Sequence, residues 1–346
     1  MKKLLILTQT IDSRDPVLGF MHRWIAKFAA HWQSITVICL NQGEYDLPAN
    51  VKVLSLGKET GPSRLKYLAN FYRYIFKERD NYDKVFVHMN EEYVLLGGII
   101  WRLMGKKISM WRNHHAGSLK TRLAIALSHV VFCTSKYSYT APFKKTIIMP
   151  VGIDTEAFRK ISEINKKPSS ILFLARISPV KKPHVLIDAL GILAKKNISF
   201  TAHIYGDPLP KDIGYYESLK KQVAESGMAD KVSFHAGIPN TETPRVYSEH
   251  GIFVNLSSSG MYDKTIFEAM ACETLSVASN LNLKGLIDVV FIFEEGNAAD
   301  LATKLEKILK LADSDKVEFG CRLRELVVSK HSLSELSHKL EGVLAH

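Results

Sequence analysis

The feature that most constrains this chain is a repeated alternation of short apolar runs with amphipathic stretches. In the first half, runs of strand length are separated by stretches of helical periodicity at residues 19–32, 63–79 and 93–104. Short buried strands that alternate with helices are typical of βαβ units and a parallel sheet. The expected strands are residues 4–7, 35–40, 51–55, 84–88, 107–110, 130–134 and 146–149.

The same alternation restarts after a polar, Lys-rich stretch at residues 158–170, which we interpret as a linker. A chain of 346 residues is long enough to form two hydrophobic cores. We therefore predict an α/β protein of two Rossmann-like domains that face each other across a cleft, with ligands at the carboxyl ends of the strands. In the second half the expected strands are residues 171–175, 200–205, 232–236, 252–256 and 275–279, and the expected helices include 183–195, 215–226 and 243–249.

The composition limits the classes of binding partner and the cellular location that we expect for this chain. A net charge of +11 favours phosphorylated substrates, an acidic membrane face or nucleic acid, although a merely basic protein would show it too. Nucleic acid is not expected, because no zinc-finger, RNP or basic-zipper pattern occurs. The four cysteines lack CxxC or metal-ligand spacing and indicate reduced thiols. The apolar start is too short for a signal peptide and no run has membrane-span length, so we expect a cytoplasmic protein.

One segment, residues 257–272, is the most informative about function. A Ser-rich loop connects the apolar run 252–256 to a helix-forming run at 267–271. A helix N-terminus that follows a strand and a loop binds phosphate through free N–H groups and the helix dipole. Glu268, which we place near the helix start, would repel a phosphate but suits a hydroxylated ligand such as ribose. The segment therefore predicts a nucleotide-sugar site.

Basic residues follow the strand at 171–175. Arg176 comes directly after it, and Lys181 and Lys182 lie in the same loop. An Arg fork and a mobile Lys charge can clamp a diphosphate, whereas a solvated basic loop is the alternative interpretation. The next two strands end in glycines, Gly206 and Gly237, where backbone can approach a ligand closely.

In this order the motifs resemble those of the retaining glycosyltransferases of family 4 (glycosyl transferases group 1), which have the GT-B fold. The family's G-R-x-x-x-x-K-G, strand-G-x-G, V-x-F-x-G, EAMA and G-I-D-x-x-x-F elements are similar to residues 175–182, 205–207, 232–237, 267–271 and 152–158. The specific motifs cover about residues 150–280. The resemblance implies the boundaries 1–160 for an acceptor domain and 167–330 for a donor domain. We also expect a C-terminal helix at about 331–346 to pack back onto the first domain.

The resemblance assigns roles to particular residues. It implies that Arg176 and Lys181 neutralise the donor diphosphate and stabilise the departing nucleotide. Glu268 would hold the ribose hydroxyls, and Gly237 would lie against the base. The remaining donor-binding positions implied for the second half are Gly206 and the backbone around Lys264 and Thr265. Neither a metal nor another cofactor is expected, apart from the nucleotide sugar as co-substrate.

The first half offers fewer candidates. Gly19 stands where the family's glycine loop approaches the phosphates, although a plain loop glycine is equally compatible with the sequence. The family also has a histidine after its equivalent of strand 107–110 that contacts the donor sugar. We favour His115 for this catalytic position over His114 and then His88. Each could instead be a hydrogen-bonded structural histidine.

Two departures from the family pattern stand out. Gly260 lies where the first acid of the family's E-x7-E motif belongs, which leaves the donor-sugar contacts open; Asp263 and Lys264 are candidates for the vacated space. Glu273 replaces a glycine after the EAMA run.

The resemblance implies transfer of a sugar from a nucleotide-diphosphate sugar to an acceptor hydroxyl, with retention of configuration, in glycan or glycolipid biosynthesis. A GT-B-like sugar-nucleotide epimerase or phosphorylase is an alternative. A non-catalytic nucleotide-sugar-binding subunit is another, motivated by Gly260. A dehydrogenase is disfavoured because no G-x-G-x-x-G follows the first strand.

The acceptor side is suggested by one helix. Residues 63–79 mix cations with five aromatic side chains, which would suit peripheral contact with an anionic membrane at its inner face and a glycan or lipid-linked acceptor. The alternative is a core helix whose aromatic side chains pack inward and whose cations are solvated.

Overall fold

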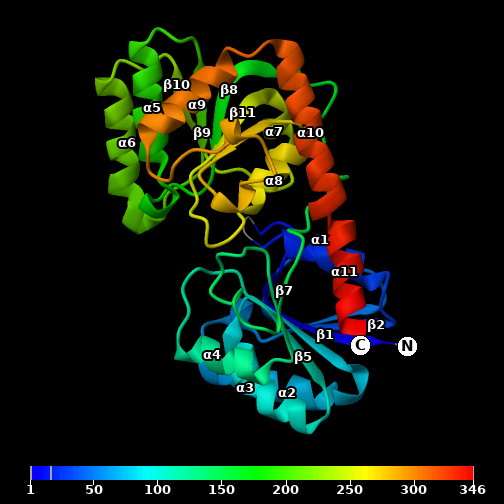
Figure 1. The fold of residues 1–346 in the computed structure, drawn as a ribbon. Coiled ribbons are helices and arrows are strands. Elements are labelled where there is room, and N and C mark those ends of the chain that lie inside the picture. Colours follow the sequence, from blue (N-terminus) through cyan, green and yellow to red (C-terminus); the bar gives the residue numbers. More distant parts are fainter. Residues whose placement is uncertain (1, 16–17, 346) are drawn as a thin grey trace. The chain divides into compact units, whose positions relative to one another are not determined.

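The computed structural model describes residues 2–15 and 18–345. The chain forms two compact units (Figure 1). The first extends to Gly152 and resumes at Leu333, and the second is Ile153–Ser332. The change of unit therefore comes before the predicted boundary at residue 160.

The first unit is built on a seven-stranded parallel sheet. Its order is β3-β2-β1-β4-β5-β6-β7, so β1 and β4 are neighbours although β2 and β3 separate them in sequence. The strands are β1 (Lys3–Ile11), β2 (Ser34–Gln42), β3 (Val51–Ser55), β4 (Lys84–His88), β5 (Lys107–Trp111), β6 (Val130–Cys133) and β7 (Thr146–Ile148).

The run of leucines and isoleucine in β1 is apolar on both faces because helices cover both. Leu4 and Ile6 point to one face, where α1 (Phe20–Ala29) and α11 (Leu333–Ala345) pack. Leu5 and Leu7 point to the other, which α2 (Arg64–Lys77), α3 (Glu91–Leu103) and α4 (Leu119–Leu127) cover. This alternation is the two-residue period of a strand buried on both sides.

The C-terminal helix α11 completes the core on the α1 side. The same cluster as Trp24 contains four buried leucines of this helix: Leu333, Leu336, Leu340 and Leu344. Their spacing of three or four residues places them on one helical face. Lys339 adds a hydrogen bond of 2.8 Å to the carbonyl oxygen of Ile148.

Helix α4 is absent from the elements predicted above. Its run LKTRLAIAL is short, and only Thr121, Ala124 and Ile125 are buried. A local signal fixes its start: the Ser118 and Thr121 side chains each bond to the other residue's backbone N–H, forming a capping box.

The second unit has a five-stranded parallel sheet in the order β10-β9-β8-β11-β12. The strands are β8 (Lys167–Leu174), β9 (Thr201–Tyr205), β10 (Val232–His235), β11 (His250–Asn255) and β12 (Leu275–Ala278). The helices are α5 (Pro183–Lys195), α6 (Ile213–Glu225), α7 (Thr243–Glu249), α8 (Lys264–Ala271), α9 (Ala298–Leu309) and α10 (Asp313–His331).

The stretch 158–170 is not a linker. Phe158 is buried against Tyr247, and the Arg324 guanidinium donates to the carbonyl oxygens of Phe158 and Thr155. The strand expected at 171 already begins at Lys167. Its first residues are polar because they lie at an exposed strand end, where Lys167 pairs with Glu249 at 2.7 Å.

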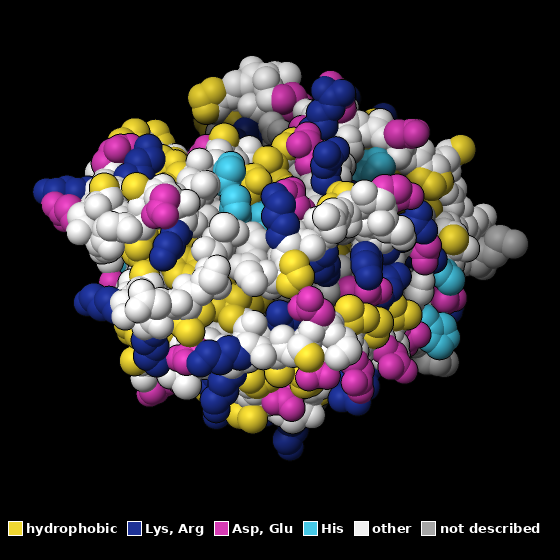
Figure 2. Space-filling view, turned by 90° about the horizontal axis from the view of Figure 1, so that it is seen from above, with side chains coloured by type: hydrophobic (Ala, Val, Ile, Leu, Met, Phe, Trp, Pro, Cys, Tyr) yellow, Lys and Arg dark blue, Asp and Glu magenta, His cyan; other side chains and the backbone are white. Residues whose placement is uncertain are grey.

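The surface charge is mixed on the face that Figure 2 draws, where Lys and Arg side chains alternate with Asp and Glu. The excess of positive charge is therefore not gathered into one basic patch there. Cys39, Cys133 and Cys272 are buried free thiols, and Cys321 is an exposed one. No helix in the described part of the chain is long and apolar enough to cross a membrane.

Candidate functional site

The strand order places the candidate site of the second unit. β8 lies between β9, which follows it in sequence, and β11, which comes much later. In open parallel sheets, ligands bind outside the carboxyl ends of the strands at such a point of reversed order. The loops after β8 and β11 meet there, and they carry Lys181 and the Ser-rich segment.

Lys181 is anchored across these two loops. Its ammonium group donates to Asp263 Oδ2 at 2.7 Å and to Ser257 Oγ at 3.2 Å. The Ser257 hydroxyl donates to the same carboxylate oxygen at 2.8 Å. On the other side, Thr265 Oγ1 donates to Asp263 Oδ1 at 2.9 Å. The charge of Lys181 is therefore already matched by a carboxylate.

Asp263 is the N-cap of α8. Its side chain accepts a hydrogen bond from the Thr265 backbone N–H, and the helix begins at Lys264. Burial works to raise the pKa of Asp263, but the charge of Lys181 and hydrogen bonds from Lys181, Ser257 and Thr265 hold it well below its usual range. The N-terminus of α8, where we predicted a phosphate, is thus already capped by the negatively charged Asp263 carboxylate.

Glu268 does not lie near the helix start. Because α8 begins three residues before the predicted 267, Glu268 is in its second turn and only 5% exposed. Its carboxylate accepts long hydrogen bonds from Asn240 Nδ2 at 3.4 Å and from the Tyr247 hydroxyl at 3.5 Å. Burial and the nearby Glu268 raise the pKa of Tyr247, which stays a neutral donor.

Arg176 and Lys182 differ from Lys181 in their surroundings. Arg176 is exposed, and its guanidinium makes no hydrogen bond or ion pair to the residues that the structure describes. Lys182 pairs with Glu295, which also accepts from the Ser258 hydroxyl at 2.6 Å. Nothing in the local sequence indicates Glu295 for this position, because it lies 113 residues after Lys182.

The three glycines of interest in the second unit differ in conformation and surroundings. Gly206 has a φ of +148°, and a Cβ there would overlap the Ala175 carbonyl oxygen, so close packing of the ends of β8 and β9 requires glycine. Gly237 is exposed, and the nearest atom to a Cβ there would be a carboxylate oxygen of Asp207, at 2.7 Å. Gly260 is buried in the loop that precedes Asp263.

The first unit has its own point of reversed strand order, between β1 and β4. Gln9, near the end of β1, donates to Asn90 after β4 at 3.1 Å. Gly19 precedes α1, and a Cβ there would be 2.6 Å from the Asp15 carbonyl oxygen, so the turn itself requires a small residue. Residues 16 and 17 of this loop lie outside the described residues.

The three candidate histidines lie in different surroundings. His115 is exposed and its ring stacks on His114 at 4.5 Å, while His114 Nδ1 accepts from the Ala116 N–H at 3.0 Å. His88 is 3% exposed and its ring lies among aromatic side chains, including Trp24 and Phe20. The surroundings of His88 favour a packing role, and His115 stays the candidate for a ligand contact.

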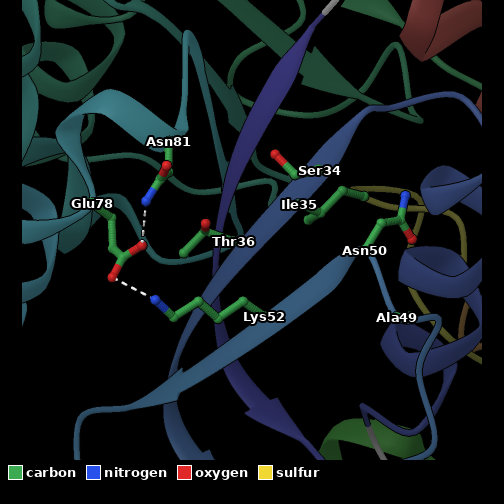
Figure 3. A pocket seen from close by; sticks show the side chains of 8 residues that line it. All are labelled: Ser34, Ile35, Thr36, Ala49, Asn50, Lys52, Glu78 and Asn81. Atoms are coloured by element: carbon green, nitrogen blue, oxygen red, sulfur yellow. Dashed lines mark hydrogen bonds and ion pairs between the residues drawn. The ribbon is translucent and has the colours of Figure 1, made fainter.

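A pocket of about 230 Å³ lies elsewhere in the first unit (Figure 3). In Figure 3 the Glu78 carboxylate joins Lys52 at 2.7 Å and Asn81 at 2.9 Å. The lining comes from the amino ends of β2 and β3 and from Glu78 and Asn81 after α2. The strand ends are at the edge opposite the one where parallel sheets bind ligands. Among residues 2–15 and 18–345, no group of three His, Cys, Asp or Glu side chains is placed to hold a metal.

Comparison with known proteins agrees with this architecture. The model of the family Glycosyl transferases group 1 matches residues 154–318, so the second unit carries a domain of that type. The whole fold is similar to the crystal structure of Anabaena Alr3699/HepE in complex with UDP and glucose, with a TM-score of 0.78, 18% identity and full coverage of both chains. The predicted GT-B architecture of two Rossmann-like domains is confirmed.

Sequence relatives match over part of their length. The D-inositol 3-phosphate glycosyltransferase of Frankia alni is 26% identical over 153 residues, covering 41% of this chain and 38% of the relative. The poly(ribitol-phosphate) α-N-acetylglucosaminyltransferase of Staphylococcus aureus is 26% identical over 175 residues, covering 48% and 33%. The chain thus spans between a third and two fifths of these relatives' own length.

Proposed function

We propose that this chain is a retaining glycosyltransferase of family 4 that moves a sugar from a nucleotide-diphosphate sugar to an acceptor hydroxyl. The group 1 domain at residues 154–318 and the relatives named as glycosyltransferases support the reaction class. The UDP and glucose named with the similar Anabaena structure support a nucleotide-sugar donor. A role in glycan or glycolipid biosynthesis, a cytoplasmic location and peripheral contact with an anionic membrane are parts of the same proposal.

The observation that carries the proposal is the unequal pair of cations at the β8–β11 edge. Lys181 is neutralised by Asp263 at 2.7 Å, whereas Arg176 is exposed with no ion pair among the described residues. A diphosphate that arrives at this edge would meet Arg176 as the uncompensated charge, and a guanidinium binds phosphate in a bidentate manner. Lys181 would contribute by turning from Asp263 toward the phosphates.

In the proposed reaction, the bond from the anomeric carbon to the diphosphate breaks. The acceptor oxygen forms its bond to that carbon on the same face, and a phosphate oxygen of the leaving group takes the acceptor proton. Arg176 and Lys181 stabilise the negative charge that develops on the diphosphate, so that neither a metal nor a protein nucleophile is needed. Glu268 would exchange its long bonds to Asn240 and Tyr247 for the ribose hydroxyls.

The experiment compares Arg176→Ala with the wild type after a thermal-shift screen of UDP-, GDP- and ADP-sugars has identified the donor. We expect kcat to fall about 10²- to 10³-fold, as when one donor to a developing oxyanion is lost, and to fall less in His115→Ala. Arg322→Ala is the matched control, because Arg322 is exposed on α10 and pairs only locally with Glu318. Turnover of Arg176→Ala at the wild-type rate would contradict the proposal, and the anomeric configuration of the product, read by NMR, tests retention.

Gly260 supports a second candidate, a nucleotide-sugar-binding subunit without catalysis. The position of the family's first acid holds a buried glycine, and the nearby Asp263 is occupied by Lys181 and the start of α8. Donor binding without transfer or hydrolysis, with every acceptor pool offered, would favour this candidate.

A further inference from the structure

The outer surface of the first unit's helical layer has an unusual composition. Helices α2, α3 and α4 cover the same face of the sheet and appear close together in Figure 1. The Tyr72 hydroxyl of α2 donates to the Leu96 carbonyl oxygen of α3 at 3.3 Å, and Arg102 of α3 donates to the Leu127 carbonyl oxygen of α4 at 2.8 Å. The three helices therefore present one outer surface, which we call the α2–α4 face.

Large apolar side chains are exposed on all three helices of this face. α2 buries Phe71 and Ile75 and packs the partly buried Tyr67, Tyr72 and Tyr74 against the same core, as the interpretation of residues 63–79 as a core helix expects. That interpretation does not account for its exposed apolar side chains. Eight large apolar side chains of these helices are exposed, at helical spacings within α3 and α4. They are Leu65 (82%), Leu68 (38%), Phe76 (45%), Leu96 (38%), Ile99 (62%), Leu103 (84%), Leu119 (83%) and Leu123 (54%). An apolar surface of this extent indicates an interaction site.

The charges of the same three helices are almost all positive. Their acids are Glu91, which pairs with Arg112, and Glu92. None of the exposed cations forms a salt bridge with a described acid. They are Arg64, Lys66, Arg73, Lys77, Arg102, Lys120 and Arg122. The surface therefore offers both apolar contact and positive charge that is not held in ion pairs with the described acids.

Three kinds of partner can be compared with this surface. A second copy of the chain, related by a two-fold axis, would bring the seven cations against themselves. Nucleic acid would engage the cations but leave the leucines against phosphates and water. An anionic bilayer satisfies both features, because apolar side chains enter the acyl boundary while Lys and Arg remain at the headgroups.

We propose that the α2–α4 face docks the protein onto an anionic lipid bilayer. This inference deepens the proposed function, on which it rests only for the identity of a lipid-linked acceptor. The face belongs entirely to the first unit, so docking does not depend on donor binding in the second. Leu103 and Leu119, the two most exposed leucines of the face, would enter the bilayer.

The test is flotation of the full chain with vesicles of phosphatidylcholine, alone or mixed with phosphatidylglycerol. We expect binding only to the mixed vesicles, and its loss at ~1 M salt, where charges are screened beyond about 3 Å. The double variant Leu103→Gln/Leu119→Gln and the double variant Arg73→Gln/Lys77→Gln should each lower partitioning about tenfold. The matched controls are Val317→Gln, exposed by 57% on α10, and Lys221→Gln on α6.

Several outcomes would overturn the proposal: no binding of the wild type, equal binding to both vesicles, or an equal loss in the controls. A dimer in solution that the Leu103→Gln/Leu119→Gln variant abolishes would assign the face to a second copy instead. Thermal melting verifies that each variant folds, and donor-induced thermal shifts are measured on the same samples. Vesicle binding without any donor-induced thermal shift would contradict the proposed function and support the docking face. A donor-induced shift without vesicle binding would support the proposed function and contradict the docking face.

Discussion

At the residue scale, the cations of the candidate site differ in whether their charge is already neutralised by an acid of the chain. Arg176 and Lys181 are five positions apart and equivalent as motif residues, but Lys181 is held by Asp263 and Ser257 whereas Arg176 is exposed. The sequence pattern could identify both cations. It could not reveal the pairing, because Lys181 and Asp263 are 82 residues apart and meet only when β8 and β11 become neighbours.

Replacement of Asp263 separates its two roles. We expect Asp263→Ala to destabilise the protein by about 2 kcal/mol at neutral pH, because it removes the N-cap of α8 and the partner of Lys181. Asp263→Asn should cost less, since Asn is an equally good N-cap. Urea denaturation measures both changes, with Ser258→Ala in the neighbouring loop as a control.

The effect of Asp263 should also depend on pH with a definite sign. Its folded-state pKa is depressed, so its ionised form contributes stability above the unfolded-state pKa of about 3.9. The contribution disappears as the pH falls below that value toward the folded-state pKa. A difference between wild type and Asp263→Asn that grew on acidification would contradict the Lys181 ion pair.

At the scale of elements, the sequence predicted the strands and helices that are marked by hydrophobic periodicity. The bounds of β3, β4, α5 and α7 agree with the predictions, and most other strands differ by a few residues at their ends. Errors arose where polar residues next to an apolar run belong to the same element. α8 begins earlier than its apolar run because Asp263 caps it, and β8 begins in a polar stretch because its first residues are exposed.

A group of histidines on β9, β10 and β11 predicts acid sensitivity of the second sheet. His250 of β11 lies close to His203 of β9, its Nδ1 is 2.7 Å from the Ser170 hydroxyl, and its buried Nε2 has no partner among the described residues. Burial, followed by the charges of His203, Lys167 and His235, lowers the pKa of His250 to about 4, against the opposing effect of Glu249.

The folded state therefore resists a proton that the unfolded state accepts below about pH 6.5. We expect the free energy of unfolding to fall from about pH 6.5 to pH 4, with His250 accounting for about 3 kcal/mol of the fall. His250→Gln should flatten this dependence. His331, whose pKa burial also lowers to about 4, makes a parallel contribution that the variant leaves in place. An unchanged pH profile in His250→Gln would refute the assignment.

At the scale of the whole molecule, the first unit is assembled from two separated pieces of chain. The sequence indicated two domains because the strand–helix alternation restarts, but its polar stretch at 158–170 suggested too late a boundary. The chain leaves the first unit after Gly152 and returns at Leu333. These two passages lie together, since the Ile153 N–H donates to the His331 carbonyl oxygen at 2.9 Å.

Truncation of a core leucine in α11 measures how far the first unit depends on its second piece. Leu336 is fully buried beside Trp24 and Gly152, and we expect Leu336→Ala to destabilise the protein by about 3 kcal/mol. Ser334→Ala, exposed on the same helix, should change stability by less than about 0.5 kcal/mol. Equal melting curves for the two variants would mean that α11 adds little to that core.

The discontinuity of the first unit has a consequence for biosynthesis. A ribosome completes all seven strands of its sheet long before it translates Leu333–Ala345, so the α1 side of the core is left without its leucines while the whole of Ile153–Ser332 emerges. The second unit, continuous in sequence, can finish folding during synthesis, whereas the first must wait for Leu333–Ala345. The nascent chain therefore exposes an unfinished apolar face while Ile153–Ser332 is translated, which is the interval in which chaperones would recognise it.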